Sequence, residues 1–147
     1  MSAGFRIEGT EELRAALRKF PEAAKRGAYR GLKKGSIRIQ REARQLAPVD
    51  TGRLRASIIY RVRQVAGGVQ AIVGSIVKYA PFREFPTRPH FVPKRYIGRW
   101  AELHGFGRTG IKVSGRATPF LIPAVEAEKQ AVINDVIQEV KAELERL

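Results

Sequence analysis

The segment from residue 21 to residue 46 has a small residue at every fourth position: Ala23, Gly27, Gly31 and Gly35. Pro21 suits the first position of a helix, and apolar residues recur at helical spacing as far as Leu46, so we predict one helix of roughly 40 Å over this segment. Each glycine inside a helix costs about 1 kcal/mol relative to alanine. Three glycines on one face therefore predict that another backbone approaches closely, either from a sheet of this chain or from a neighbouring subunit. The alternative is a surface helix that merely tolerates them.

Two segments with a β-pattern follow this helix, at 57–66 and 69–77. Both are rich in β-branched residues, and Gly67-Gly68 between them is a strong hairpin signal, because a tight hairpin turn needs positive φ angles. Arg61 and Arg63 alternate along the first strand and so share one face of it. We predict that this face meets either water or an acidic partner, which makes the two arginines candidate interface residues.

The remaining segments complete an α+β pattern. We expect a short strand at 5–9, a helix from Thr10 to Phe20, a proline-rich ordered loop at 79–93 that cannot be a central strand, a short helix within 94–106, a short strand at 111–113 and a helix from about 119 to the last residue. The predicted fold is a small antiparallel β-sheet with a β-hairpin, packed against a long N-terminal helix and a long C-terminal helix. We expect a single domain over 1–147, with a loop-rich insert at about 88–118.

The charge is strongly basic and unevenly distributed. The chain has 28 Lys and Arg against 14 Asp and Glu, a formal net charge of +14. Residues 51–118 hold 13 basic and 2 acidic side chains, whereas residues 119–147 hold 3 and 6. A basic body with an acidic final helix is compatible with nucleic-acid binding, with head-to-tail contacts between copies, or with an acidic neighbour.

The triplet Asp50-Thr51-Gly52 is also the triplet that carries the catalytic carboxylate of aspartic proteases. Two such carboxylates must share a proton, but Arg53 and Arg55 follow the triplet directly and would keep Asp50 ionised. A helical segment leads into the triplet, where those proteases have an apolar strand. We therefore predict that Pro48 ends the long helix and that Asp50 caps a short turn before the first hairpin strand.

No other motif indicates catalysis or a bound group. There is no cysteine, and the two histidines, His90 and His104, have no metal-ligand spacing to acidic residues. The glycines at 105–110 lack the Lys-Ser/Thr of a phosphate-binding loop. We predict a protein without enzymatic activity, metal or cofactor.

Several segments, taken together and in order, resemble the "gene product ten"-like tail-component family of tailed phages, also called neck or tail-completion proteins. They are FRIEGTEELRAALRKF, REARQLAPVDTGRLRASI, YAPFREFPT and RATPFLIPAVE, and they span nearly the whole chain. One departure is Pro86, where members of the family usually have glycine. The positions that match the family signature are Pro48, Asp50, Thr51, Gly52, Leu54, Ser57, Tyr79, Ala80, Glu84, Phe85, Pro119, Phe120, Pro123 and Ala124.

The resemblance implies a structural virion protein at the head–tail junction, present in the host cytoplasm during assembly. It implies a homo-oligomeric ring, which we expect to be a hexamer, in contact with neck, tail-terminator or tail-tube proteins, with DNA passing nearby and no membrane involved. The glycine row and the two sheet arginines are then candidate contact surfaces. The residues leave open a different class of function, a basic nucleic-acid-binding protein without sequence specificity.

Overall fold

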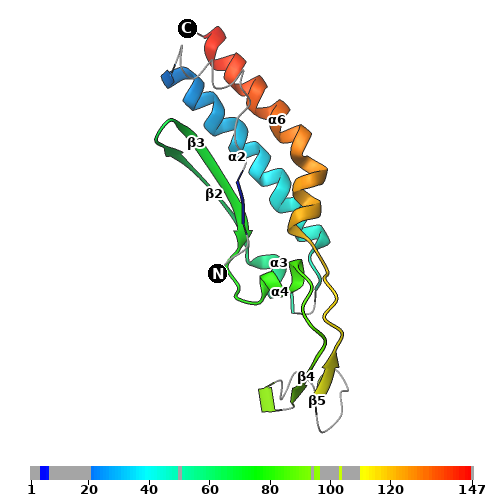
Figure 1. Cartoon of the computed structure of the whole chain (residues 1–147). Helices are drawn as coiled ribbons and strands as arrows, with labels where there is room; N and C mark the ends of the chain where they lie inside the picture. The colour runs from blue at the N-terminus through cyan, green and yellow to red at the C-terminus, as the bar shows by residue number, and fades with distance from the viewer. Residues whose placement is uncertain are drawn as a thin grey trace.

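The computed structural model describes residues 4–6, 21–49, 51–93, 95–96, 103 and 110–146, and for 4–6 and 110–111 the backbone only. Figure 1 shows an elongated molecule with two long helices and the larger sheet at one end and a small β-ribbon at the other. In chain order the elements are β1 (Gly4–Arg6), α2 (Pro21–Leu46), α3 (Arg53–Ala56), β2 (Ile58–Val65), β3 (Gly68–Ser75), α4 (Ala80–Glu84), β4 (His90–Pro93), β5 (Gly110–Val113) and α6 (Leu121–Glu145).

The larger sheet is antiparallel, with the strand order β1-β3-β2. The predicted hairpin is confirmed, but its turn lies one residue earlier than the Gly67-Gly68 pair. Val65 pairs with Gly68, so Ala66 and Gly67 form the turn, and Gly67 has a φ of 81°. Alternate residues of β2 and β3 face α2 and join the core, among them Ile58, Ala71 and Val73. The opposite face carries Arg61 beside Ile72 and is exposed.

Helix α2 is the centre of the structure. It packs against both β2 and β3, and it lies between the sheet and α6 in Figure 1. The predicted α+β architecture and the predicted bounds of α2 are confirmed. In detail, α6 packs chiefly against α2 and so forms a third layer, and its Val132, Val136 and Val140 join the same core as the sheet.

The glycine row of α2 faces α6. A Cβ atom built on Gly31 would lie 2.4 Å from Cα of Val136, and one built on Gly27 would lie 2.5 Å from Cα of Val140. These are backbone atoms, so a side chain cannot be fitted without moving one helix. The sheet and a neighbouring subunit were the two partners expected for this row, and both expectations were wrong, because its partner is α6 of the same chain.

Ion pairs between the two helices flank this contact. Arg26 and Arg30 both bind the carboxylate of Glu143, Lys34 binds Glu139, and Nε of Arg38 lies 2.6 Å from Oδ2 of Asp135. Half of the six carboxylates in the acidic final segment are therefore paired within the chain. Head-to-tail contact between copies was one of the interpretations compatible with the charge distribution, and these three carboxylates are already bound within the chain.

The stability of this contact should depend on pH through Glu143. Burial of the carboxylate opposes its ionised form, but the hydrogen bond from Arg26 and the charges of Arg30 and Arg146 outweigh burial and lower its pKa. A carboxylate with a lowered pKa stabilises the fold above its unfolded-state pKa of 4.5, and this contribution is lost as the pH falls through the folded value. We expect the melting temperature below pH 4.5 to fall more steeply in the wild type than in Glu143→Gln. Parallel melting curves across a pH series would contradict this assignment.

Ser36 of α2 is fully buried, and its hydroxyl has no hydrogen-bond partner among the described residues. A buried hydroxyl without a partner costs about 1–3 kcal/mol. We therefore expect Ser36→Ala to leave the protein as stable as the wild type or to stabilise it by up to about 1 kcal/mol. Chemical denaturation of the two proteins measures this difference, and a loss of more than about 1 kcal/mol would show that the hydroxyl has a partner.

The proline-rich segment 79–93 differs from the expected loop. Its first part forms α4, which tolerates Pro81 because that residue lies in the first helical turn. Its last part forms β4, which ends in Pro93 and pairs with β5 in a two-stranded ribbon. A proline is compatible with such a ribbon because it can occupy an edge position that donates no ladder hydrogen bond.

The remaining expectations are met in part or fall on residues that are not described. The predicted strand at 111–113 is confirmed as β5, and β1 covers the start of the predicted 5–9 strand. The expected helix at 10–20 lies outside the described residues, as does most of the one within 94–106. None of the helices in the described part of the chain is long and apolar enough to cross a membrane.

Candidate functional site at the junction of the helices and the ribbon

Several buried family-signature positions converge on one place, which we call the junction: α3, α4 and the first turn of α6. Ala80, Phe120 and Ala124 have no exposed surface there, and Leu54 is 4% exposed. These side chains come from three separate segments of the sequence and share one core with the end of the hairpin. The junction is therefore the place where the helical end of the molecule is joined to the ribbon (Figure 1).

Glu84 holds the start of α6. Its side chain is only 3% exposed, and its two carboxylate oxygens accept three backbone hydrogen bonds. Oε2 accepts from the N–H groups of Phe120 and Leu121 at 3.0 and 2.9 Å, and Oε1 accepts from the N–H of Ile122 at 2.6 Å. A negative charge at a helix N-terminus is also favoured by the helix dipole.

This arrangement accounts for every unpaired donor at the start of the helix. An α-helix begins with four N–H groups that have no partner within it. In α6 the first three belong to Phe120, Leu121 and Ile122, which bind Glu84, and the fourth position is Pro123, which has no N–H. The cap is therefore supplied from 36 residues away in the sequence.

A sequence signal for this cap existed. The N-cap residue of α6 is Phe120, which offers no side-chain oxygen, whereas most helices begin at Ser, Thr, Asp or Asn. A long helix that lacks a local cap needs an acceptor from elsewhere. Glu84 is one of only two acidic residues between 51 and 118, so it was the natural candidate.

A second buried polar contact ties α3 to the hairpin. The hydroxyl of Ser57 donates to the carbonyl of Leu54 at 2.6 Å and lies 2.6 Å from the hydroxyl of Ser75. Ser75 in turn accepts the N–H of Val77 at 3.2 Å. Since Ser57 uses its own proton on Leu54, Ser75 is the donor between the two hydroxyls. The signature serine thus fixes the turn that leads from α3 into β2.

The turn before α3 is described from Thr51 onward. Its N-cap position is Gly52, with a φ of 83° that glycine adopts without strain, and Oγ1 of Thr51 lies 3.4 Å from the N–H of Arg53. Asp50 lies outside the described residues, so its capping role stays a prediction. Pro48 lies two residues before Asp50, just after the end of α2, and is half-buried.

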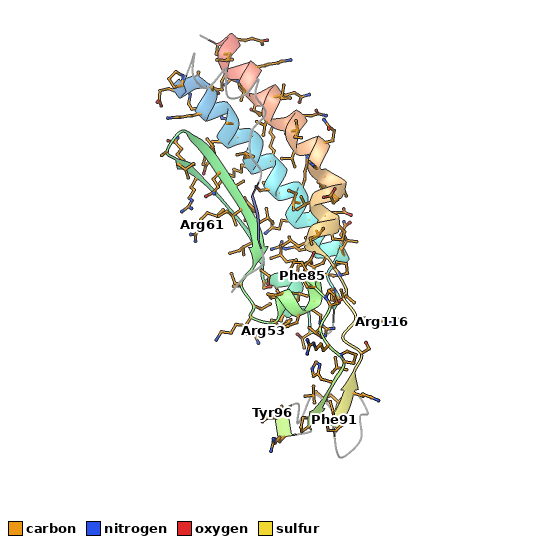
Figure 2. All side chains as sticks on the ribbon, viewed as in Figure 1. Arg53, Arg61, Phe85, Phe91, Tyr96 and Arg116 are labelled. Atoms are coloured by element: carbon orange, nitrogen blue, oxygen red, sulfur yellow. The ribbon has the colours of Figure 1, made fainter. Side chains whose placement is uncertain are left out.

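Other signature residues lie on the surface. Tyr79 and Phe85 are 39% and 49% exposed, and Thr51 and Pro119 are exposed as well. Arg61 and Arg63 are exposed on the outer face of β2, where Arg63 donates a hydrogen bond to Gln70 at 3.0 Å. Figure 2 shows Arg61 pointing away from the helices, at a distance from Phe85 and the junction. The structure therefore does not bring the two arginines together with the signature cluster.

A sequence model of one protein family matches residues 11–85, half of the 147-residue chain; its description is HK97-gp10-like, "Bacteriophage HK97-gp10, putative tail-component". The chain belongs to this family. The resemblance drawn from the signature segments is thereby confirmed. No curated protein and no solved structure matches the chain.

Membership makes this chain a bacteriophage tail component, and hence a structural protein of the virion. The family is not a known class of enzyme. The match ends one residue after Glu84 and so contains α2, α3, the hairpin and α4. The phage tail component thus has one half of the Glu84 cap inside the matched region and the other half, the start of α6, beyond it.

The tail component shows no arrangement suited to metal binding among its described residues. His90, one of the two histidines, donates from Nδ1 to the carbonyl of Arg88 at 2.8 Å. Glu84 is buried, and its two carboxylate oxygens accept three backbone N–H groups. The junction can position segments of the chain, and its buried groups are used for that purpose.

Proposed function

We propose that this phage tail component acts at the head–tail junction, in neck or tail completion, as one subunit of a closed ring. The observation that supports a subunit contact is the outer face of the hairpin. Ile59 and Ile72 are 43% and 37% exposed there, beside the exposed Arg61 and Arg63. An apolar face bordered by charge is typical of a surface that another protein covers.

In this proposal the ring consists of six copies, and its subunits meet through head-to-tail contacts that close by rotation. The acidic counterpart of Arg61 and Arg63 is not the paired face of α6, because Asp135, Glu139 and Glu143 already bind α2. It is supplied by carboxylates outside that contact or by a neighbouring neck, tail-terminator or tail-tube protein. The whole chain, 1–147, functions as one domain, with 88–118 as an insert, and assembles in the host cytoplasm.

Electron microscopy of the purified protein, alone and co-expressed with its neck and tail-terminator proteins, tests this proposal. We expect rings with a central hole, and we expect the double variant Arg61→Glu/Arg63→Glu to abolish them. The matched control is Lys33→Glu/Arg41→Glu, which reverses two exposed charges of α2 and should leave the rings intact. A monomer under both conditions would refute the ring, and tails that assemble normally without the protein would refute the role.

The net charge of +14 supports a second candidate, binding of nucleic acid without sequence specificity. Affinity that depends on phosphate contacts falls steeply as salt rises. Gel shifts over a salt series distinguish the two functions. We expect no tight complex at physiological salt, whereas tight binding with a steep log-log salt dependence would favour the nucleic-acid function over the subunit contact.

A further inference from the structure

A groove of about 750 Å³ lies between α4 and the β4–β5 ribbon. Its apolar lining includes Tyr79, Phe82 and Val113, and its basic lining includes Arg83, Arg88 and Arg116. Phe82 is 64% exposed, although phenylalanine is among the residues most often buried in folded proteins. In Figure 2, Arg116 lies between the junction and the ribbon, and Phe91 lies farther out, on the ribbon itself.

The two chain segments that frame the groove are bonded to each other. The N–H of Thr87 donates to the carbonyl of Gly115 at 2.9 Å, and the N–H of Thr118 donates to the carbonyl of Arg83 at 2.8 Å. Gly115 has a φ of 74°, and a Cβ atom there would lie 2.0 Å from the carbonyl oxygen of Thr87. The groove is therefore pre-formed, and an occupant would not have to order its walls.

The described lining of the groove carries no acidic side chain. Among the described residues from 51 to 120, the only carboxylate is that of Glu84, which is buried and bound to the start of α6. The guanidinium groups of Arg83, Arg88 and Arg116 consequently have no carboxylate partner within the described part of this end of the chain. An occupant that fits must bring both acidic and apolar groups.

We propose that this groove binds an acidic, apolar segment of a different protein of the virion. A second copy of the chain fits less well, because Asp135, Glu139 and Glu143 on the acidic face of α6 are already paired with α2. A nucleic acid supplies phosphates for the arginines and bases that stack on aromatic rings, but no aliphatic groups for Val113. The inference rests on the proposed function in that it requires a neighbouring tail or neck protein.

Selection from a yeast-displayed library of random 12-residue peptides, with the full chain as the target, tests this inference. We expect the enriched peptides to combine Asp or Glu with Leu, Phe or Trp. In fluorescence anisotropy, Arg116→Glu and Phe82→Ser should each weaken binding of the selected peptides at least tenfold. Arg41→Glu, the same charge reversal at an exposed position of α2, should leave binding unchanged.

Three results would overturn the inference. The first is a lack of enrichment over a target carrying Arg116→Glu. The second is equal binding of peptides whose apolar residues are replaced by serine. The third is displacement of the peptides by a 20-base-pair DNA duplex at a lower concentration than by unlabelled peptide. Melting temperatures of the variants, whose changed side chains are exposed, verify that they are folded. Selection does not require rings, so a failure of ring assembly and a failure of the groove are distinguishable.

Discussion

Glu84→Ala should lower the free energy of unfolding by about 3–5 kcal/mol, since each buried donor left without an acceptor costs about 1–3 kcal/mol. Three backbone N–H groups at the start of α6 bind this carboxylate, and two of these hydrogen bonds are fully buried. A start of α6 one residue later would not compensate for this loss, because Pro123 would still lie in the first turn of the helix. Chemical denaturation followed by circular dichroism measures the loss.

Glu84→Gln removes the charge and one acceptor oxygen but keeps the volume of the side chain. The amide has one acceptor oxygen, and its NH₂ group would face an N–H donor where the carboxylate had its second oxygen. We expect a loss of about 2–3 kcal/mol, smaller than that of the alanine variant. Glu126→Ala removes an exposed glutamate of the same helix and should change stability by less than about 0.5 kcal/mol. If Glu84→Gln and Glu126→Ala are equally stable, Glu84 does not cap the helix.

The sequence was sufficient for elements whose signals are local. The bounds of α2 follow from Pro21 and the apolar periodicity, and the hairpin follows from two glycines between β-branched runs. In each case the residues that decide the structure lie inside the element itself. The position of β5 was predicted for the same reason, from a short β-branched run between glycines.

The contacts between elements could not be predicted in the same way. The glycine row predicts that something approaches closely, but it carries no information about which surface does so. The complementary signal, valines at 132, 136 and 140, looks like any apolar helix face. Similarly, Phe120 at the N-cap signals that α6 needs an acceptor from elsewhere, but the partners of Glu84 are backbone groups, and the sequence does not specify that this carboxylate lies against them. Strand β4 was missed because the four prolines of segment 79–93 counted against a strand, although only Pro93 lies in β4 and a two-stranded ribbon tolerates it.

The family signature acquires a physical meaning at the junction. The segment around Ser57 fixes the entry into the hairpin, and the segment with Ala80 and Glu84 carries the acceptor for α6. The third segment supplies N–H donors such as that of Phe120, the position without an N–H at Pro123, and buried side chains such as that of Ala124. Each segment is short and unspecific alone, and together they specify how the two long helices are joined to the ribbon end.

Replacement of Gly31 has the second large expected effect, and its sign is diagnostic. In an exposed helix Gly→Ala stabilises by about 1 kcal/mol. In this chain the new Cβ would lie 2.4 Å from Cα of Val136, so α2 and α6 would have to separate. We therefore expect Gly31→Ala to destabilise the protein by about 1–3 kcal/mol, and Gly31→Leu at least as much, because it adds further atoms at the same place.

Gly68→Ala is the matched control for this experiment. It is the same substitution at a glycine with nothing within 4 Å of the added carbon, so we expect it to be neutral or to stabilise by up to about 1 kcal/mol. Denaturation midpoints of the three variants, beside the yield of completed virions, give both readouts. A more stable Gly31→Ala would mean that the helices are not in close contact at this position. Opposite signs of the stability change at Gly31 and Gly68 would show that the small residues of α2 allow α6 to approach closely. The contact between α2 and α6, with its flanking ion pairs, would then be what stabilises the helical end of the tail component.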